Sequence, residues 1–353
     1  MLVWAYCKDP GGTAGMMPVV RELHSRGVVV RLFAEGAALQ ICEREGLPTE
    51  TPLLEQLALH DELPKLFVTA MCSGGGLGRD LVPHLRPRGV WCVALQDSWG
   101  ARLMTDWADT IYRPHDIVVN DHVGEAIVNA AWQDWSGVIV SGYPALDRFA
   151  GIDPALERQL VRDRYGIPRD ARVILFGGQV KGTSAVLAEA IAAVRQVGGC
   201  FLVPRRHPRL PVNAPDDARR WEEIMGAFPK DMLLPQLDAA TMDEALAVSD
   251  VVVAAFSTVL VEASVMRKPA IAVLMPETGM KRFREETGGI MEEHPLVSLG
   301  CVAKATSHEE LVSCIAVGLA GHPRRLLQER AFQVDGKNAA RLVDVFMESL
   351  KRA

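Results

Sequence analysis

The sequence predicts an α/β protein built of two Rossmann-like, doubly wound domains that face each other across a cleft. Short apolar runs alternate with stretches of helical periodicity, and this pattern starts again near the middle of the chain. Continuous apolar runs of this kind are typical of parallel strands that helices bury on both faces. The length of 353 residues exceeds that of one typical core and suits two domains.

In the first half, strands are expected at 2–7, 28–34, 65–72, 89–96, 116–120 and 137–142. Helical apolar spacing is found at 16–27 and 36–46, and a glycine C-cap closes the first of these helices. The glycine-rich stretch 8–15 between the first strand and the first helix is expected to be a loop. Together these elements predict an N-terminal domain over 1–146.

The pattern restarts after a linker placed at about 143–153, where prolines and a glycine punctuate the chain. A polar helix at 153–167 precedes strands expected at 172–178, 200–204, 231–235, 250–255 and 269–275, with helices between them. This predicts a C-terminal Rossmann-like domain over 147–335. The remaining segment, 336–353, is expected to form a helix that packs back on the first domain.

The overall charge argues against a nucleic-acid partner. Lys and Arg number 38 and Asp and Glu 44, which gives a formal net charge of −6 and no basic footprint for a duplex. No apolar run reaches the roughly 18 residues of a membrane span, so any membrane contact is expected to be peripheral. The sequence does not indicate an oligomeric state.

The cysteines and acidic residues indicate a reducing compartment and chemistry without a metal. The seven cysteines are scattered and form no CxxC, so neither a disulfide framework nor a zinc site is expected, and a cytoplasmic location fits best. No Asp-x-Asp and no His/Cys cluster with metal spacing occurs. We therefore expect no metal and no cofactor.

Polar and glycine-rich motifs follow several strands of the second half. Gly177 and Gly178 end the strand expected at 172–178, where they would permit close backbone approach and an anion-binding nest, or simply a tight turn. Arg206 and His207 follow the strand at 200–204 in "VPRRHPR". They suit charge-assisted bonds to a diphosphate, and a solvated basic turn is the alternative.

A third group of polar residues follows the strand at 250–255. Ser257 and Thr258 open the next helix and Glu262 lies on its first turns. The hydroxyls are typical helix caps, but a helix N-terminus also binds phosphate, and the carboxylate could hold a sugar hydroxyl. By contrast, "TMDE" at 241–244 predicts an ordinary capping box.

In their order along the chain, these features resemble the nucleotide-binding half of GT-B glycosyltransferases. The resemblance is carried by "RRHPR", "AAFSTVLVEA" and "RKPAIAV", and it is strongest to the CDP-glycerol glycerophosphotransferase, UDP-N-acetylglucosamine 2-epimerase and capsule-synthesis types. The segments "VIVSGYPALDRF" and "GGTAGMMPVVRELHSRG" resemble the hinge and the first loop and helix of such proteins. The resemblance to these proteins implies that His207, Ser257 and Thr258 contact a diphosphate and that Glu262 bonds a ribose. The chain has Phe-Ser-Thr where the epimerases usually have Ser-Gly-Gly.

The first half offers candidates for catalysis and for binding the acceptor. Asp97 directly follows the strand at 89–96 and is a candidate general base, or else the N-cap of a following helix. Gly11, Gly12 and Thr13 are expected to line the substrate site with backbone groups. Weaker candidates lie further along the chain: His115, Asp121, His122 and Glu125.

The sequence thus predicts a metal-independent enzyme that transfers a glycosyl or polyol-phosphate group from a nucleotide-activated donor, such as a UDP-sugar, to an acceptor that the sequence does not identify. The reaction would serve the synthesis of cell-surface polysaccharide or glycoconjugate. Asp97 and His207 would be catalytic. A UDP-N-acetylglucosamine 2-epimerase-like enzyme and a non-catalytic nucleotide-sugar-binding protein remain as alternatives.

Overall fold

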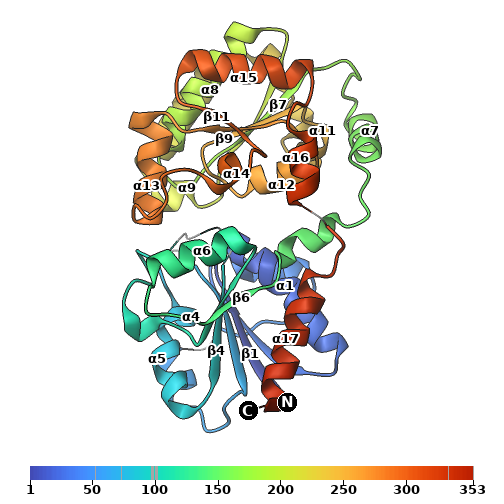
Figure 1. The fold of residues 1–353 in the computed structure, drawn as a ribbon. Coiled ribbons are helices and arrows are strands. Elements are labelled where there is room, and N and C mark those ends of the chain that lie inside the picture. The colour runs from blue at the N-terminus through green and yellow to red at the C-terminus, as the bar shows by residue number, and fades with distance from the viewer. Residues whose placement is uncertain (52, 73, 97–98, 100–101, 333, 353) are drawn as a thin grey trace. The chain divides into compact units, whose positions relative to one another are not determined.

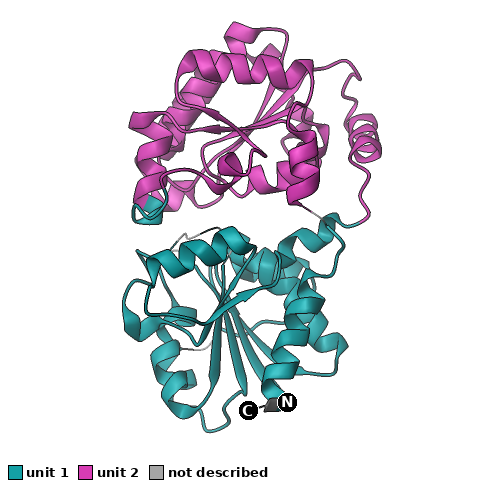
Figure 2. Cartoon of the chain, in the orientation of Figure 1, with its two compact units in different colours: residues 1–150, 286–291, 334–353 teal, residues 151–285, 292–333 magenta. Residues whose placement is uncertain are grey.

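The computed structural model describes residues 1–353 except 52, 73, 97–98, 100–101, 333 and 353 (Figure 1). The chain forms two compact units, shown in separate colours in Figure 2. Unit 1 contains residues 1–150, 286–291 and 334–353, and unit 2 contains residues 151–285 and 292–333. Each unit has its own parallel sheet with helices on both faces, as the alternating apolar runs predict.

Unit 1 is built on a six-stranded sheet of order β2-β1-β3-β4-β5-β6, in which all neighbouring strands are parallel. Its strands are β1 (Leu2–Cys7), β2 (Val29–Ala34), β3 (Leu66–Ala70), β4 (Trp91–Leu95), β5 (Asp116–Val119) and β6 (Val138–Val140). Its helices are α1 (Pro10–Ser25), α2 (Ala37–Arg44), α3 (Leu54–Ala58), α4 (Leu77–Asp80), α5 (Val82–Leu85), α6 (His122–Ala131) and α17 (Asn338–Arg352), with short turns η1 (Arg86–Arg88), η2 (Thr110–Tyr112) and η3 (Pro144–Phe149).

Unit 2 is built on a five-stranded parallel sheet of order β11-β10-β9-β7-β8. Its strands are β7 (Val173–Gly177), β8 (Phe201–Arg205), β9 (Val251–Ala254), β10 (Ala270–Val273) and β11 (Ala303–Ala305). The longer helices are α7 (Pro154–Tyr165), α8 (Thr183–Val197), α10 (Pro215–Ala227), α11 (Met242–Val248), α12 (Val259–Val265), α13 (Lys281–Thr287), α15 (His308–Ala320) and α16 (Arg325–Ala331). The shorter ones are α9 (Leu210–Asn213), η4 (Lys230–Met232), η5 (Pro235–Leu237), η6 (Pro276–Met280) and α14 (Pro295–Ser298).

Two strand assignments differ from the sequence-based expectation. The apolar stretch 231–235 forms no strand but only an isolated bridge between Leu202 and Leu233, next to the turn η4. The sheet instead gains β11, three residues long, which contains Lys304 and has no continuous apolar run to reveal it.

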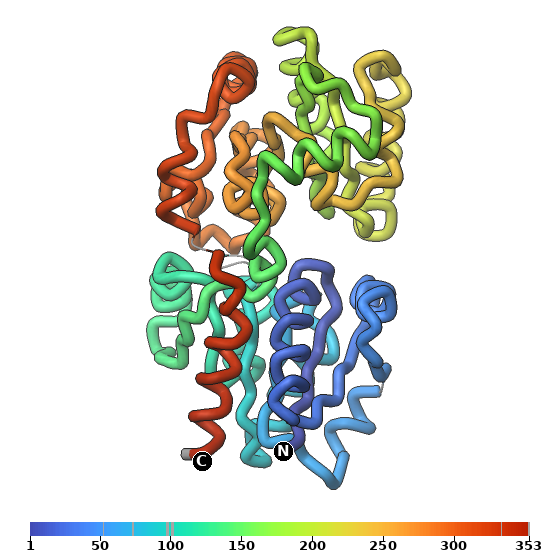
Figure 3. The backbone as a smooth tube through the Cα atoms, turned by 90° about the vertical axis from the view of Figure 1, so that its right-hand side faces the viewer, coloured from blue at the N-terminus to red at the C-terminus, as the bar shows by residue number. Residues whose placement is uncertain are grey.

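The last helix, α17, packs in unit 1 against α1 and η3 (Figure 3). Asn338, its first residue, donates to the backbone oxygen of Tyr143 at 3.2 Å and to Asp147 Oδ1 at 2.8 Å. A Cβ atom at Gly142 would lie 2.0 Å from Asn338 Oδ1, so only glycine permits this approach. The stretch 143–150 is thereby packed into unit 1.

Both sheets have the same winding, and this locates their ligand crevices. Chain order reverses between β1 and β3 in unit 1 and between β7 and β9 in unit 2. In open parallel sheets, ligands bind outside the carboxyl ends of the two strands that flank such a reversal. Among the described residues, no helix is long and apolar enough to cross a membrane.

Candidate functional site

Three motifs singled out in the sequence leave the second sheet at one edge. Gly177, the last residue of β7, is the register partner of Arg205 at the end of β8 and of Ala254 at the end of β9. The segments that begin at Gly178, Arg206 and Ala255 therefore emerge side by side at the carboxyl edge. Two of them, after β7 and after β9, flank the point of chain reversal where a ligand crevice is expected.

The two glycines at the end of β7, Gly177 and Gly178, serve close packing. A Cβ atom at Gly177 would lie 2.6 Å from Cγ1 of Val259, so the missing side chain lets the first turn of α12 pack on the strand end. The N–H of Gly178 donates to the Arg205 oxygen at 2.8 Å, and the N–H of Gln179 donates to Thr183 Oγ1 at 3.1 Å. Since both amides donate within the protein, they do not form the anion nest considered from the sequence.

The N-terminus of α8 is already occupied by a carboxylate that sequence reasoning missed. Asp217 of α10 accepts hydrogen bonds from the N–H of Thr183 at 2.9 Å and the N–H of Ser184 at 3.1 Å, and also from the Ser184 hydroxyl. A negative charge at this position satisfies the free amides and the helix dipole. The first amides of α8 are therefore paired within the protein.

Arg205, at the end of β8, is a structural residue. Its guanidinium donates to the backbone oxygens of Leu237 at 2.8 Å and Ala240 at 2.7 Å, which fixes the loop around η5. Burial lowers the pKa of Arg205, with carboxylates and Tyr165 opposing this effect. The capping box of the following helix is confirmed, because Thr241 and Glu244 bond each other's backbone amides.

The turn after Arg205 presents two residues of different exposure. Arg206 is exposed and forms an ion pair with Glu222 of α10. His207 is half-buried, and its Nδ1 accepts a hydrogen bond from the N–H of Arg209 at 3.1 Å. In the neutral ring this places the proton on Nε2, which makes Nε2 the donor. Arg209, two residues further on, is half-buried rather than solvated.

The hydroxyls of Ser257 and Thr258, just before α12, contribute little to capping this helix. Thr258 occupies the N-cap position with helical φ and ψ of −57° and −21°, and among the described residues its side chain makes no capping hydrogen bond. The Ser257 hydroxyl accepts from the N–H of Val259 at 3.4 Å, a long contact. Glu262 is half-buried in the first turn. Capping therefore explains Ser257 and Thr258 less well than the sequence suggested.

In unit 1, the expected glycine-rich loop is the first turn of α1, which begins at Pro10. A Cβ atom at Gly12 would lie 2.6 Å from the Cβ of Ala70, and the Thr13 hydroxyl donates to the Asp9 oxygen at 2.7 Å. Gly12 and Thr13 thus hold α1 against the sheet. The loop assignment is wrong, because proline at the first helical position starts a helix there.

A small cavity of about 10 Å³ lies where α1 begins, at the carboxyl ends of β4 and β5. It is lined by Gly11, Gly12, Gly15, Leu95, Gln96, Val118, Asn120, Tyr143 and Pro144. Gln96 is 4% exposed, and its Nε2 has no hydrogen-bond partner within the described part of the chain. This residue was missed, although a polar residue ending the apolar run at 89–96 was a usable signal.

The structure describes the other candidate residues of unit 1 with the exception of Asp97. Asp97 lies outside the described residues, and the helix considered after it is not formed at 102–107, which are turns. Asp121 caps α6 through the N–H of Gly124 at 2.8 Å and accepts from Trp99 Nε1 at 2.9 Å, a structural role. Burial lowers the pKa of His115, whose Nδ1 accepts from the N–H of Cys92 at 3.0 Å. His122 and Glu125 form an exposed pair at 2.8 Å.

Curated relatives share part of the sequence. The chain is 30% identical over 214 residues to the UDP-N-acetylglucosamine–N-acetylmuramyl-(pentapeptide) pyrophosphoryl-undecaprenol N-acetylglucosamine transferase of Mycobacterium avium, which covers 59% of this chain and 49% of the relative. The enzyme of the same name from Mycobacterium tuberculosis is 31% identical over 211 residues, covering 57% and 47%. The match thus spans about half the length of these relatives. No family model matches the chain.

Solved structures match nearly the whole chain at low identity. Methanocaldococcus jannaschii UDP-GlcNAc 2-epimerase in complex with UDP-GlcNAc and UDP gives a TM-score of 0.67 at 12% identity, covering 99% of this chain and 100% of that one. A glycosyltransferase from Rickettsia africae gives 0.64 at 11% identity, covering 100% and 99%. Acinetobacter baumannii MurG gives 0.61 at 10% identity, covering 98% and 99%.

These likenesses define the fold of the protein. The chain has the GT-B fold, the two-domain α/β fold of these solved structures, and 59% of it is similar in sequence to the curated N-acetylglucosamine transferase of Mycobacterium avium. This confirms the fold class and the resemblance inferred from the motifs. The curated relatives add a transferase type that the motif comparison did not name.

Proposed function

We propose that the protein is a nucleotide-sugar-dependent enzyme whose unit 2 holds a nucleoside diphosphate at the carboxyl edge of its sheet. The register of Gly177 with Arg205 and Ala254 carries this proposal, since it gathers three polar segments at the crevice of a doubly wound sheet. Solved structures of the same fold contain UDP or UDP-GlcNAc, which supports a uridine nucleotide as the first ligand to test. The reaction is transfer of a glycosyl or polyol-phosphate group.

His207 and Arg206 would hold the diphosphate. Nε2 of His207 is the donor nitrogen of the neutral ring, and it can donate to an oxygen of the leaving phosphate. Arg206 lies on the same turn and forms an ion pair with the exposed Glu222, which it would have to release. Exposed ion pairs are worth about 0–1 kcal/mol, so a phosphate can compete for this guanidinium.

The segment after β9 would complete the donor site. The hydroxyls of Ser257 and Thr258 lie before α12 without strong capping bonds, and they can donate to phosphate oxygens. Glu262, on the first turn, would accept from ribose hydroxyls. Gly177 and Gly178 contribute by letting α12 and the end of β8 approach the strand end closely.

Unit 1 would bind the acceptor and supply the base. Gly11 and Gly12 line the cavity at the start of α1, with Thr13 fixing that turn. Asp97, which follows the buried Gln96, remains the proposed general base.

We further propose a cytoplasmic reaction in glycoconjugate or cell-surface polysaccharide synthesis with peripheral membrane contact. The seven cysteines, all described and all free thiols, suit a reducing compartment.

A sugar-nucleotide epimerase is the second candidate. The observation that favours it is the better structural match to a UDP-GlcNAc 2-epimerase, at a TM-score of 0.67 against 0.61 for MurG. The curated sequence relatives favour transfer instead.

Incubation with UDP-N-acetylglucosamine without an acceptor separates these activities. An epimerase produces a new sugar nucleotide, visible by NMR, whereas a transferase at most hydrolyses the donor slowly. A purely binding protein would show neither this conversion nor turnover with any acceptor, yet would still bind UDP. Thermal shift with UDP, CDP and GDP identifies the base, since about 100-fold excess over Kd adds about 2.7 kcal/mol of stability.

A further inference from the structure

The opposite, amino edge of the second sheet contains a cavity of about 370 Å³. Arg172, Asp250 and Pro269, which line it, each immediately precede a strand of the sheet, β7, β9 and β10 respectively. The remaining lining comes from α7, from the turn before β7, from Lys268 and from the carboxyl end of α15. This cavity is therefore separate from the proposed nucleotide crevice, which lies where the same strands end.

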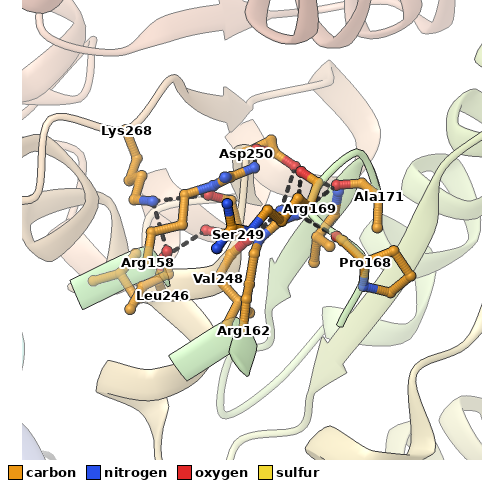
Figure 4. Close-up of polar contacts among 12 residues, drawn as sticks. Arg158, Arg162, Pro168, Arg169, Ala171, Leu246, Val248, Ser249, Asp250 and Lys268 are labelled. Carbon is orange, nitrogen blue, oxygen red and sulfur yellow. Dashed lines mark hydrogen bonds and ion pairs between the residues drawn. The ribbon is translucent and has the colours of Figure 1, made fainter. Parts of the chain in front are cut away.

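One carboxylate that lines this cavity, that of Asp250, accepts several hydrogen bonds (Figure 4). Asp250 accepts from Arg158 at 2.6 Å, from Arg162 at 3.0 Å and from the N–H of Val173 at 2.8 Å. Arg162 has a side chain only 1% exposed, and it also donates to the backbone oxygens of Ala171 and Val248 at 2.9 Å and 2.8 Å. One negative charge is thus shared by two guanidinium groups.

Lys268 adds a buried ammonium group to this set. The residue is 6% exposed, and its Nζ donates to the backbone oxygens of Ala247 at 2.7 Å and Ser249 at 2.9 Å. No carboxylate of the described chain forms an ion pair with it. Burial, together with the nearby Arg158 and Arg162, lowers the pKa of Lys268 to about 7, while Asp250 opposes the shift.

The rim of the cavity adds further positive charge. Arg169 and Arg172 are exposed, and neither side chain makes a hydrogen bond or ion pair with the residues that the structure describes. Three arginines, Arg158, Arg169 and Arg172, and the partly protonated Lys268 therefore line the cavity against two carboxylates, Asp170 and Asp250. Arg162 does not line the cavity but pairs with Asp250. The carboxyl end of α15 contributes roughly half a negative charge, which does not cancel this excess.

We propose that this cavity is a second ligand site, which binds a small molecule through a phosphate or diphosphate group. Arg169 and Arg172 would form charge-assisted bonds with its oxygens, and Lys268 would gain a counter-ion. The volume is in the range of small-molecule sites, so a phosphorylated metabolite as well as the bare anion can be accommodated. The ligand is distinct from the sugar nucleotide, whose site uses the other edge of the sheet.

Calorimetric titration with inorganic pyrophosphate at constant ionic strength tests the proposal. The wild type is titrated with and without saturating UDP, so that the nucleotide crevice is occupied in one arm. In the presence of UDP we expect one saturable pyrophosphate site, and combined Arg169→Ala and Arg172→Ala should weaken it about tenfold or more. Pyrophosphate binding that disappears when UDP is present would contradict the second site. Arg195→Ala, an exposed arginine that does not line the cavity, should leave the affinity unchanged.

The outcomes separate this proposal from the proposed function. Failure of UDP to bind would contradict the nucleotide site alone, because the dependence of pyrophosphate binding on Arg169 and Arg172 can still be measured. Absence of saturable pyrophosphate binding, or equal affinity in the double variant and the wild type, overturns the second site.

Proton uptake gives an independent readout. At a pH about one unit above the pKa of Lys268, most of its side chains are neutral, and binding of sulfate should favour the protonated ammonium. The protein should therefore take up protons when sulfate binds. Calorimetric titrations in two buffers of different ionisation enthalpy detect this uptake. The other charged or titratable groups around Lys268 are Arg158, Arg162, Arg169, Asp170, Arg172, Asp250 and His322. Lys268→Met should abolish the uptake and His322→Gln should retain it. Proton uptake that persists in the Lys268→Met variant would contradict the role of Lys268 in this second site.

Discussion

Gly177 and Ala254 are register partners at the carboxyl ends of β7 and β9, and the helix that follows Ala254 packs directly over Gly177. This relationship brings the motif at 257–262 next to the turn at 177–178, although about 80 residues separate them in the sequence. The proposed donor site depends on it, because a wider separation would place the two segments out of reach of one ligand.

Replacing Gly177 by alanine should therefore destabilise the protein. The new Cβ atom would lie 2.6 Å from Val259 Cγ1, and overpacking of this kind costs about 1–3 kcal/mol. Gly226→Ala is the matched control, since that glycine lies within α10 with no atom near its missing Cβ, and alanine there should stabilise by up to about 1 kcal/mol. Urea unfolding measures both. Equal stabilities of the two variants would contradict the close packing of α12 on β7.

Replacing Asp217 should loosen the start of α8. Its carboxylate accepts from the backbone amides of Thr183 and Ser184, and their loss leaves part-buried donors unpaired at a cost of about 1–3 kcal/mol. The neighbouring Asp216 is exposed and pairs with the exposed Arg219, so Asp216→Ala should cost less than about 1 kcal/mol. If Asp217→Ala unfolds at the same urea concentration as Asp216→Ala, the capping role is refuted.

Replacing His207 should reduce turnover rather than stability. If Nε2 stabilises charge on the leaving diphosphate, His207→Ala should lower kcat by about 10²-fold, by analogy with the loss of one oxyanion donor. His122→Ala, an exposed histidine of unit 1, serves as the control and should retain full activity. Steady-state kinetics that show no difference between these variants would remove His207 from the mechanism.

Replacing Glu262 should weaken nucleotide binding. Loss of hydrogen bonds between a carboxylate and ribose hydroxyls costs about 1.5–3 kcal/mol, which corresponds to a Kd for UDP raised by roughly 10- to 150-fold. Glu189→Ala on α8, outside the proposed site, is the control for removal of a carboxylate. An unchanged Kd in calorimetry would make Glu262 an ordinary first-turn residue that interacts with the helix dipole.

The stability of the protein should fall in weak acid because of His294. This residue caps α14, with Nδ1 accepting from the N–H of Leu296 at 3.2 Å, and burial lowers its pKa to about 4. The folded state binds this proton less readily than the unfolded state, so stability is lost as the pH drops from about 6.5 towards 4, by about 3 kcal/mol.

The variant His294→Asn keeps a capping oxygen and removes the titration. Its unfolding free energy should depend less on pH over this interval than that of the wild type, as denaturant titrations at several pH values would show. An identical slope for the two proteins would show that other groups cause the acid sensitivity.

The fold was predictable because most strands are continuous apolar runs between amphipathic helices. The exceptions have local causes: β11 is too short and too polar to stand out, and the run at 231–235 is apolar but forms only one bridge. The start of α1 was predictable in principle from Pro10.

The site was predictable to the extent that it depends on strand ends. Gly177, His207 and Ser257 were found because each follows an apolar run. Asp217 was not, because its partners lie 33 and 34 residues away and no local pattern announces the contact. The burial of Lys268 against two backbone oxygens could not be predicted, because it depends on tertiary contacts and not on the local sequence.

Hydrogen–deuterium exchange of the protein with and without UDP tests the central claim most directly. UDP should slow exchange together in the three segments that leave the carboxyl edge of the second sheet, at 178–184, 206–209 and 256–262, while the amino-edge segment 169–172 stays unchanged. Binding of UDP that leaves these three segments unprotected would contradict the account.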